Sequence, residues 1–220
     1  MKPNANIVSV VVISVLLLGC QTMTNEPVEL PDKGVEKQDI TVTEIEPDDQ
    51  LNKALEDFAK NEYTKCATEI RKAAKSVRVI ASSASEKRRN AINKAAESLE
   101  TLATKVEKNE VKDLNSLYES FGKTGRALAA NRLSISEMEY FKHSQQNSGR
   151  VLANTIHQLE KSVSSHHRDL TDQEKQVLND GLEVAERLQK GDKVDEDDLK
   201  SALQSIDNEI EKWNKEFERL

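Results

Sequence analysis

Proline is almost absent from this chain: the four prolines are Pro3, Pro27, Pro31 and Pro47, and none follows position 47. Aromatic residues are also scarce, at 4% of the sequence, whereas Ala, Glu, Lys and Leu are plentiful. Because a proline inside a helix costs about 3 kcal/mol, this composition is typical of a helical protein. The sequence therefore predicts an all-α fold beyond Pro47.

The chain lacks an excess of basic residues, with 32 Lys and Arg against 39 Asp and Glu and a net charge of −7. Proteins that bind nucleic acid usually have a basic face, and proteins that bind anionic lipid electrostatically usually have a polybasic segment. The basic cluster 87–89 is interpreted as a solvated helix face. Nucleic acid is therefore not expected as a partner.

A long apolar run is also missing, since a helix that crosses a bilayer needs about 20 apolar residues. The run from Ile7 to Leu18 is shorter, follows Lys2 and ends at the small residue Gly19. This order is typical of an export signal that is removed, which we assign to residues 1–19. The alternative is a buried N-terminal strand or helix of a cytosolic protein.

The segment Leu17-Leu18-Gly19-Cys20 resembles the lipobox of bacterial lipoproteins. The resemblance implies cleavage between Gly19 and Cys20, a diacylglyceryl group on the Cys20 thiol and acylation of the new amine. One acyl chain anchors a protein only marginally, so the three chains of this class would give stable attachment. Gln21 after the cysteine implies sorting to the outer membrane, with the protein facing the periplasm.

If Cys20 is acylated, Cys66 is the single remaining cysteine and a disulfide within the chain is excluded. Free cysteine is commonly a small buried apolar residue, which is the interpretation we favour for Cys66. A reactive thiol and an intermolecular bridge are the alternatives.

Residues 20–47 hold three of the prolines and show little apolar periodicity, so we expect the acylated cysteine and a flexible, disordered linker there. Residues 48–220 are expected to form an antiparallel helical bundle of about six long helices. Apolar residues recur there at helical spacing. Glycines inside the predicted helices are interpreted as points of close helix contact: Gly122, Gly125, Gly149 and Gly181.

Apolar positions in this region coincide after a shift of 82 residues, as from Phe58 to Tyr140 (140 − 58), and later after 85, as from Leu128 to Trp213 (213 − 128). We interpret this as a duplication with related halves at about 50–132 and 133–217. Chance alignment of two helical patterns is the alternative. No break separates Ser134–Lys142 from the preceding helix, which allows the two to fuse into one rod.

The segment ALEDFAKNEYTKCATEIRKAAKSV, residues 54–77, resembles the helical hairpin of tetratricopeptide repeats and uncharacterised YfdX-like envelope proteins. The 82-residue spacing (140 − 58) differs from the roughly 34-residue tetratricopeptide period. The resemblance therefore implies helical hairpins, and it identifies no functional residue.

Four histidines are the candidates for a metal or haem site, although zinc ligands usually stand at spacings such as i, i+4 beside further Cys or carboxylate ligands. His143 and His157 are further apart, and two adjacent histidines at a corner are usually solvated. We therefore expect no cofactor and no metal at these residues: His143, His157, His166 and His167.

The sequence contains none of the usual nucleophile, zinc-protease, redox or phosphate-loop motifs, so no catalytic residue is assigned and an enzyme is not expected. The acidic run 195–199 lacks the spacing of a calcium loop and is interpreted as a helix start.

The function expected from these features is a lipid-anchored, non-enzymatic scaffold or partner-binding module in the periplasm. The alternative is a protein that binds a small ligand, metal or haem through its histidines or a pocket between the halves. Since aromatic residues are enriched at interaction hot spots, we take them as the candidate surface for an envelope protein partner, with core packing as the alternative. These residues are Tyr118, Tyr140, Phe141, Trp213 and Phe217.

Overall fold

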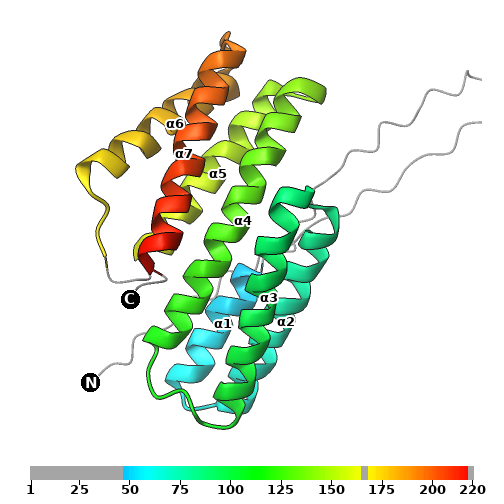
Figure 1. Ribbon diagram of the computed structural model, residues 1–220, viewed down its shortest axis with the longest axis vertical. Helices are drawn as coiled ribbons and strands as arrows, with labels where there is room; N and C mark the ends of the chain where they lie inside the picture. The colour runs from blue at the N-terminus through cyan, green and yellow to red at the C-terminus, as the bar shows by residue number, and fades with distance from the viewer. Residues whose placement is uncertain (1–46, 165–167, 218–220) are drawn as a thin grey trace, which may run out of the picture. The chain divides into compact units, whose positions relative to one another are not determined.

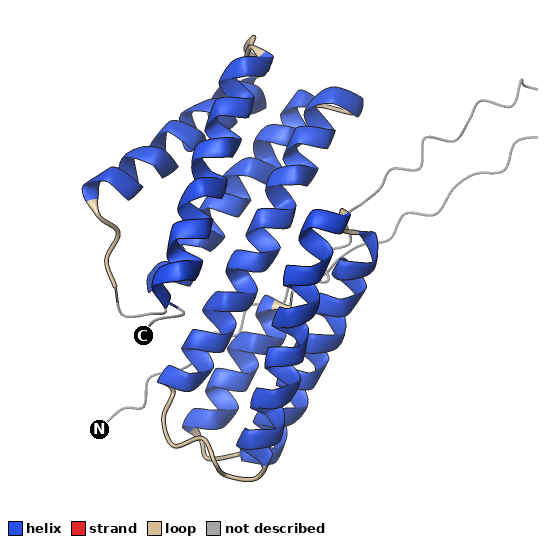
Figure 2. Cartoon of the chain, in the orientation of Figure 1, coloured by secondary structure: helices blue, strands red, loops and turns tan. Residues whose placement is uncertain are grey.

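The computed structural model describes residues 47–164 and 168–217, and this part of the chain contains helices and no strand (Figures 1 and 2). The all-α prediction is therefore confirmed. The helices are α1 (Asp48–Ala59), α2 (Tyr63–Ser83), α3 (Glu86–Glu107), α4 (Asn115–Lys142), α5 (Gln145–Ser164), α6 (Asp172–Lys190) and α7 (Glu196–Phe217). The six helices α2 to α7 are each at least 19 residues long, and α1 has 12.

The predicted signal, the lipobox with Gly19 and Cys20, and the linker to residue 46 lie outside the described residues. Among the described helices, none combines the length and the apolar character that crossing a bilayer requires.

Helix α4 belongs to two hydrophobic cores. The first core consists of side chains from α1, α2, α3 and the part of α4 up to Leu128. The second begins at Ala129 and continues through α5, α6 and α7. Helix α4 is 28 residues long, and Figure 1 shows it without interruption, so the predicted fusion of two helices into a rod is confirmed.

The helices of the two halves stand at equivalent positions along the chain. Adding 82 to the bounds of α2, 63–83, gives 145–165, and α5 occupies 145–164. Adding 82 to the bounds of α1, 48–59, gives 130–141, which lies in the last part of α4. Adding 82 to the bounds of α3, 86–107, gives 168–189, which overlaps most of α6, 172–190. The arrangement fits two related halves, and their origin by duplication stays a prediction.

Two of the predicted glycine contacts are confirmed in the second core. A Cβ on Gly149 would lie 2.5 Å from the carbonyl oxygen of Ala185, and one on Gly181 would lie 2.7 Å from the Ile206 side chain. Gly125 is different, because a Cβ there would meet its nearest neighbour, Ser162, at an ordinary 3.6 Å. A Cβ at position 149 would therefore meet the backbone of α6, whereas one at position 181 would displace the ends of isoleucine side chains from α5 and α7.

Candidate functional site

Phe141, at the C-terminal end of α4, is the predicted partner residue that the structure leaves exposed, with 48% of its surface accessible. The Tyr140 ring meets it edge-on at 5.0 Å, and the Tyr140 hydroxyl donates a 2.8 Å hydrogen bond to the carbonyl of Val194. The Lys200 ammonium lies 5.6 Å from the centre of the Phe141 ring. Met138, 37% exposed, precedes Phe141 by one turn. We call Met138 and Phe141 the Phe141 patch.

Trp213 corrects the prediction of a five-residue aromatic surface, because its side chain is 0% exposed inside the second core. It continues the buried stripe of Ile206 and Ile210 on α7, so the helical register turns it inward. Phe217 is half-buried against the same core, with the Arg126 guanidinium 4.6 Å above its ring. Tyr118 is also half-buried.

The Trp213 indole nitrogen donates a 2.7 Å hydrogen bond to Glu174, which is the centre of a buried polar network. Arg168 donates to the same carboxylate at 2.6 Å and also forms an ion pair with Glu216 at 3.0 Å. Thr171 and Glu174 form a capping box at the start of α6. This network fixes the start of α6 to α7.

Burial by itself would raise the pKa of Glu174, but the hydrogen bonds that Arg168, Trp213 and Thr171 donate outweigh it and lower the pKa to about 2. The carboxylate therefore stays ionised at neutral pH. This network was not predicted from the sequence. The spacing Thr171-x-x-Glu174 is a capping-box signature that could have identified its local part.

The histidines in the described residues do not come together. His143 is exposed just after α4, and His157 is exposed on α5, where its ring lies 3.2 Å from Glu160. His166 and His167 lie outside the described residues. Within residues 47–164 and 168–217, no three His, Cys, Asp or Glu side chains are placed so that they could hold a metal ion.

Cys66 is a free thiol that is 0% exposed in the first core, so the interpretation as a buried apolar residue is confirmed. Burial, and to a smaller extent the negative charge of Asp57, raise the pKa of the thiol to about 12. Since the thiolate is the nucleophile, this environment keeps Cys66 unreactive in the folded protein.

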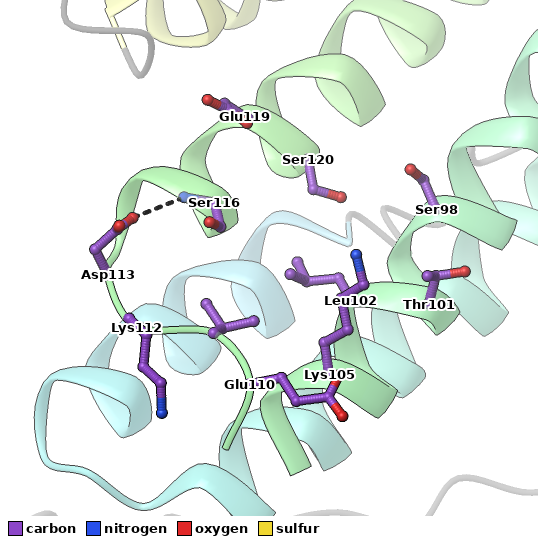
Figure 3. A pocket seen from close by; sticks show the side chains of 11 residues that line it. Ser98, Thr101, Leu102, Lys105, Glu110, Lys112, Asp113, Ser116, Glu119 and Ser120 are labelled. Atoms are coloured by element: carbon purple, nitrogen blue, oxygen red, sulfur yellow. Dashed lines mark hydrogen bonds between the residues drawn. The ribbon is translucent and has the colours of Figure 1, made fainter. Parts of the chain in front are cut away.

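A groove of about 550 Å³ lies between α3 and α4, beside the loop that joins them (Figure 3). Its apolar lining comes from Leu102 and Val111, which are 7% and 6% exposed. The rest of the lining carries hydroxyl, ammonium and carboxylate groups: Ser98, Thr101, Lys105, Glu110, Lys112, Asp113, Ser116, Glu119 and Ser120. No sequence motif predicts this groove, because it depends on where the loop returns to α4.

No protein-family model, curated protein or solved structure matches this chain.

Proposed function

We propose that this protein is a lipid-anchored, non-enzymatic helical module that binds another envelope protein in the periplasm. The resemblance of Leu17–Cys20 to a lipobox supports the anchor, and Gln21 supports the outer membrane as its location. The helical bundle is the part that would meet the partner.

The exposed Phe141 ring is the observation that carries the partner-binding role. The Tyr140 ring, which is fixed by its hydrogen bond to Val194, packs edge-on against Phe141 and limits the side-chain freedom that would be lost when a partner covers it. Aromatic anchors of this kind contribute at least about 2 kcal/mol where they form the centre of an interface. The neighbouring Met138 adds an adaptable apolar contact.

The anchor is tested by replacing each cysteine separately and fractionating cells. We expect Cys20→Ala to move the protein from the membrane to the soluble periplasmic fraction, because it removes the acylated thiol. Cys66→Ala is the matched control and should remain in the membrane. Intact-mass measurement of the wild type should show the acyl groups. Retention of Cys20→Ala in the membrane fraction would contradict the anchor.

The partner surface is tested by photo-crosslinking in living cells. A benzophenone amino acid at position 141 should give a discrete crosslinked product, whereas the same probe at the exposed position Glu183 on α6 should not. Once the crosslink has identified the partner, Phe141→Ser should recover less of that partner in a co-purification than the wild type does. The helical circular dichroism signal of the variant should be unchanged. Equal product patterns at both positions, or none at 141, would reject the Phe141 patch as the contact.

A further inference from the structure

The groove between α3 and α4 and the equivalent place between α6 and α7 each have a basic residue, and the contacts of these two residues differ. Lys105 corresponds to Arg187 (187 − 105 = 82), and Asp113 corresponds to Asp198 (198 − 113 = 85). In the second half, Arg187 donates to the carbonyl of Lys193 at 2.9 Å and lies 3.8 Å from the Asp198 carboxylate. This arginine is therefore engaged by its own half of the protein.

In the first half, the corresponding acid serves a different purpose. The Asp113 carboxylate accepts the backbone N–H groups of Asn115 at 2.9 Å and Ser116 at 3.3 Å, and so caps the start of α4. Lys105 is exposed, lines the groove and forms no ion pair with any residue in the described part of the chain. The first half thus has a lysine without an ion pair at the position where the second half has an arginine that contacts Lys193 and Asp198.

Polar groups that could bind a ligand surround this cation (Figure 3). The Ser120 hydroxyl oxygen is buried and has no hydrogen-bond partner among the described residues, and Ser98 faces it from α3. After a side-chain rotation, this hydroxyl would be a hydrogen-bonding group in the wall of the groove that a ligand could use. The exposed carboxylates of Glu110 and Glu119 also line the groove.

The balance of charge restricts the ligand class. The lining carries two lysines, Lys105 and Lys112, against three acids, Glu110, Asp113 and Glu119, so its net charge is −1 (2 − 3). The three acids disfavour a simple anion and the two lysines disfavour a simple cation, whereas a ligand with one charge of each sign can pair with both kinds of group. None of the lining residues is aromatic, so the stacking platform that sugar rings favour is missing from this groove.

We propose that this groove binds a short zwitterionic peptide. The peptide carboxylate pairs with Lys105, its ammonium group faces Glu119 across the groove, and its amides meet the hydroxyls of Ser98 and Ser120. Its side chains cover Leu102. The groove volume of about 550 Å³ lies within the usual range for small-ligand sites. This proposal does not depend on the lipid anchor or on the Phe141 patch.

The probe is tri-alanine, titrated into the full purified chain by isothermal calorimetry. We expect saturable binding, and weaker binding of tri-alanine that is amidated at its carboxyl end or acetylated at its amine. Because an exposed ion pair contributes modestly, Lys105→Gln should weaken binding about threefold to fivefold. Lys75→Gln, which removes an exposed lysine from α2, is the matched control and should bind like the wild type.

Three results would overturn the proposal. The first is absence of saturable tri-alanine binding at millimolar concentrations by a fully helical protein. The second is equal affinity of Lys105→Gln and Lys75→Gln. The third is equal binding of sodium acetate and tri-alanine, which would reduce the groove to a simple anion site. Phe141→Ser should leave tri-alanine affinity unchanged, so this test and the partner test fail separately.

Discussion

The ionised Glu174 carboxylate is expected to be a major source of stability in the second half, and Glu174→Gln tests this. Glutamine has nearly the same shape, so the change removes the charge and leaves the packing in place. The side chain is 9% exposed, and lowering its pKa from 4.5 to about 2 corresponds to about 3 kcal/mol of folding free energy. We expect the variant to lose about 2 to 3 kcal/mol at neutral pH, because Arg168 keeps its second ion pair with Glu216.

The same carboxylate predicts a pH dependence with a definite sign. Its pKa is lower in the folded than in the unfolded state, so its contribution is complete above about pH 4.5 and is lost as the pH falls towards 2. The wild type should therefore lose stability over this interval. Glu174→Gln should lack this component of the loss.

Urea unfolding followed by helical circular dichroism and by the fluorescence of Trp213, the one tryptophan of the chain, measures both effects. With a slope of about 2 kcal/mol per molar urea, the expected loss lowers the midpoint by about 1 M. Glu183→Gln, at an exposed position of the same helix, is the matched control and should keep the wild-type midpoint. Equal midpoints for Glu174→Gln and the wild type at neutral pH would refute the reasoning.

The remaining predictions concern packing, the thiol and the contact between the halves. Gly149→Ala should destabilise the protein by about 1 to 3 kcal/mol in thermal unfolding, because its Cβ would lie 2.5 Å from a backbone oxygen of α6. Gly125→Ala, with room at 3.6 Å, should be neutral or stabilising by up to about 1 kcal/mol, and the reverse order would contradict this account. Cys66 should resist a thiol reagent in the native protein and react once urea unfolds it; equal rates in both states would show that the buried thiol is accessible. Asp207, buried on α7, accepts a 2.8 Å hydrogen bond from Arg88 on α3, so the expectation of a solvated face at 87–89 was wrong for Arg88; one polar atom of each residue has no partner among the described residues. Asp207→Ala should therefore cost about 3 kcal/mol in urea unfolding, more than the double replacement of both residues by leucine; a larger cost for the double variant would contradict the buried-pair argument.

The helices were predictable because their signals are local. The absence of proline after Pro47 and the spacing of apolar residues predicted six long helices, and the missing break before Ser134 predicted the fusion within α4. Trp213 was misplaced for a reason that the same pattern could have corrected. It continues the spacing of Ile206 and Ile210, so periodicity places it inside, whereas the enrichment of aromatic residues at interfaces suggested the surface.

The polar network and the groove were not predictable, because they depend on residues that meet only in the folded chain. Trp213 and Glu174 are 39 positions apart in the sequence, and no local sequence pattern predicts that they form a hydrogen bond. The groove depends on the loop after α3, where Asn109 has a positive φ of 57° and the chain then returns to α4. Such placements follow from tertiary packing, and the short capping-box signature at Thr171 indicates only their local part.

The continuity of α4 has a consequence for the two proposed surfaces. The first core ends at Leu128 and the second begins at Ala129, within α4 and without a loop between them. The part of α4 that lines the groove is its N-terminal end, whereas Phe141 lies at the C-terminal end of the same helix. The two proposed surfaces therefore share no side chain. Effects of well-separated changes usually add. A double variant, Lys105→Gln with Phe141→Ser, should therefore combine the peptide loss of one with the partner loss of the other, and any stronger defect would mean that α4 transmits a change between the halves.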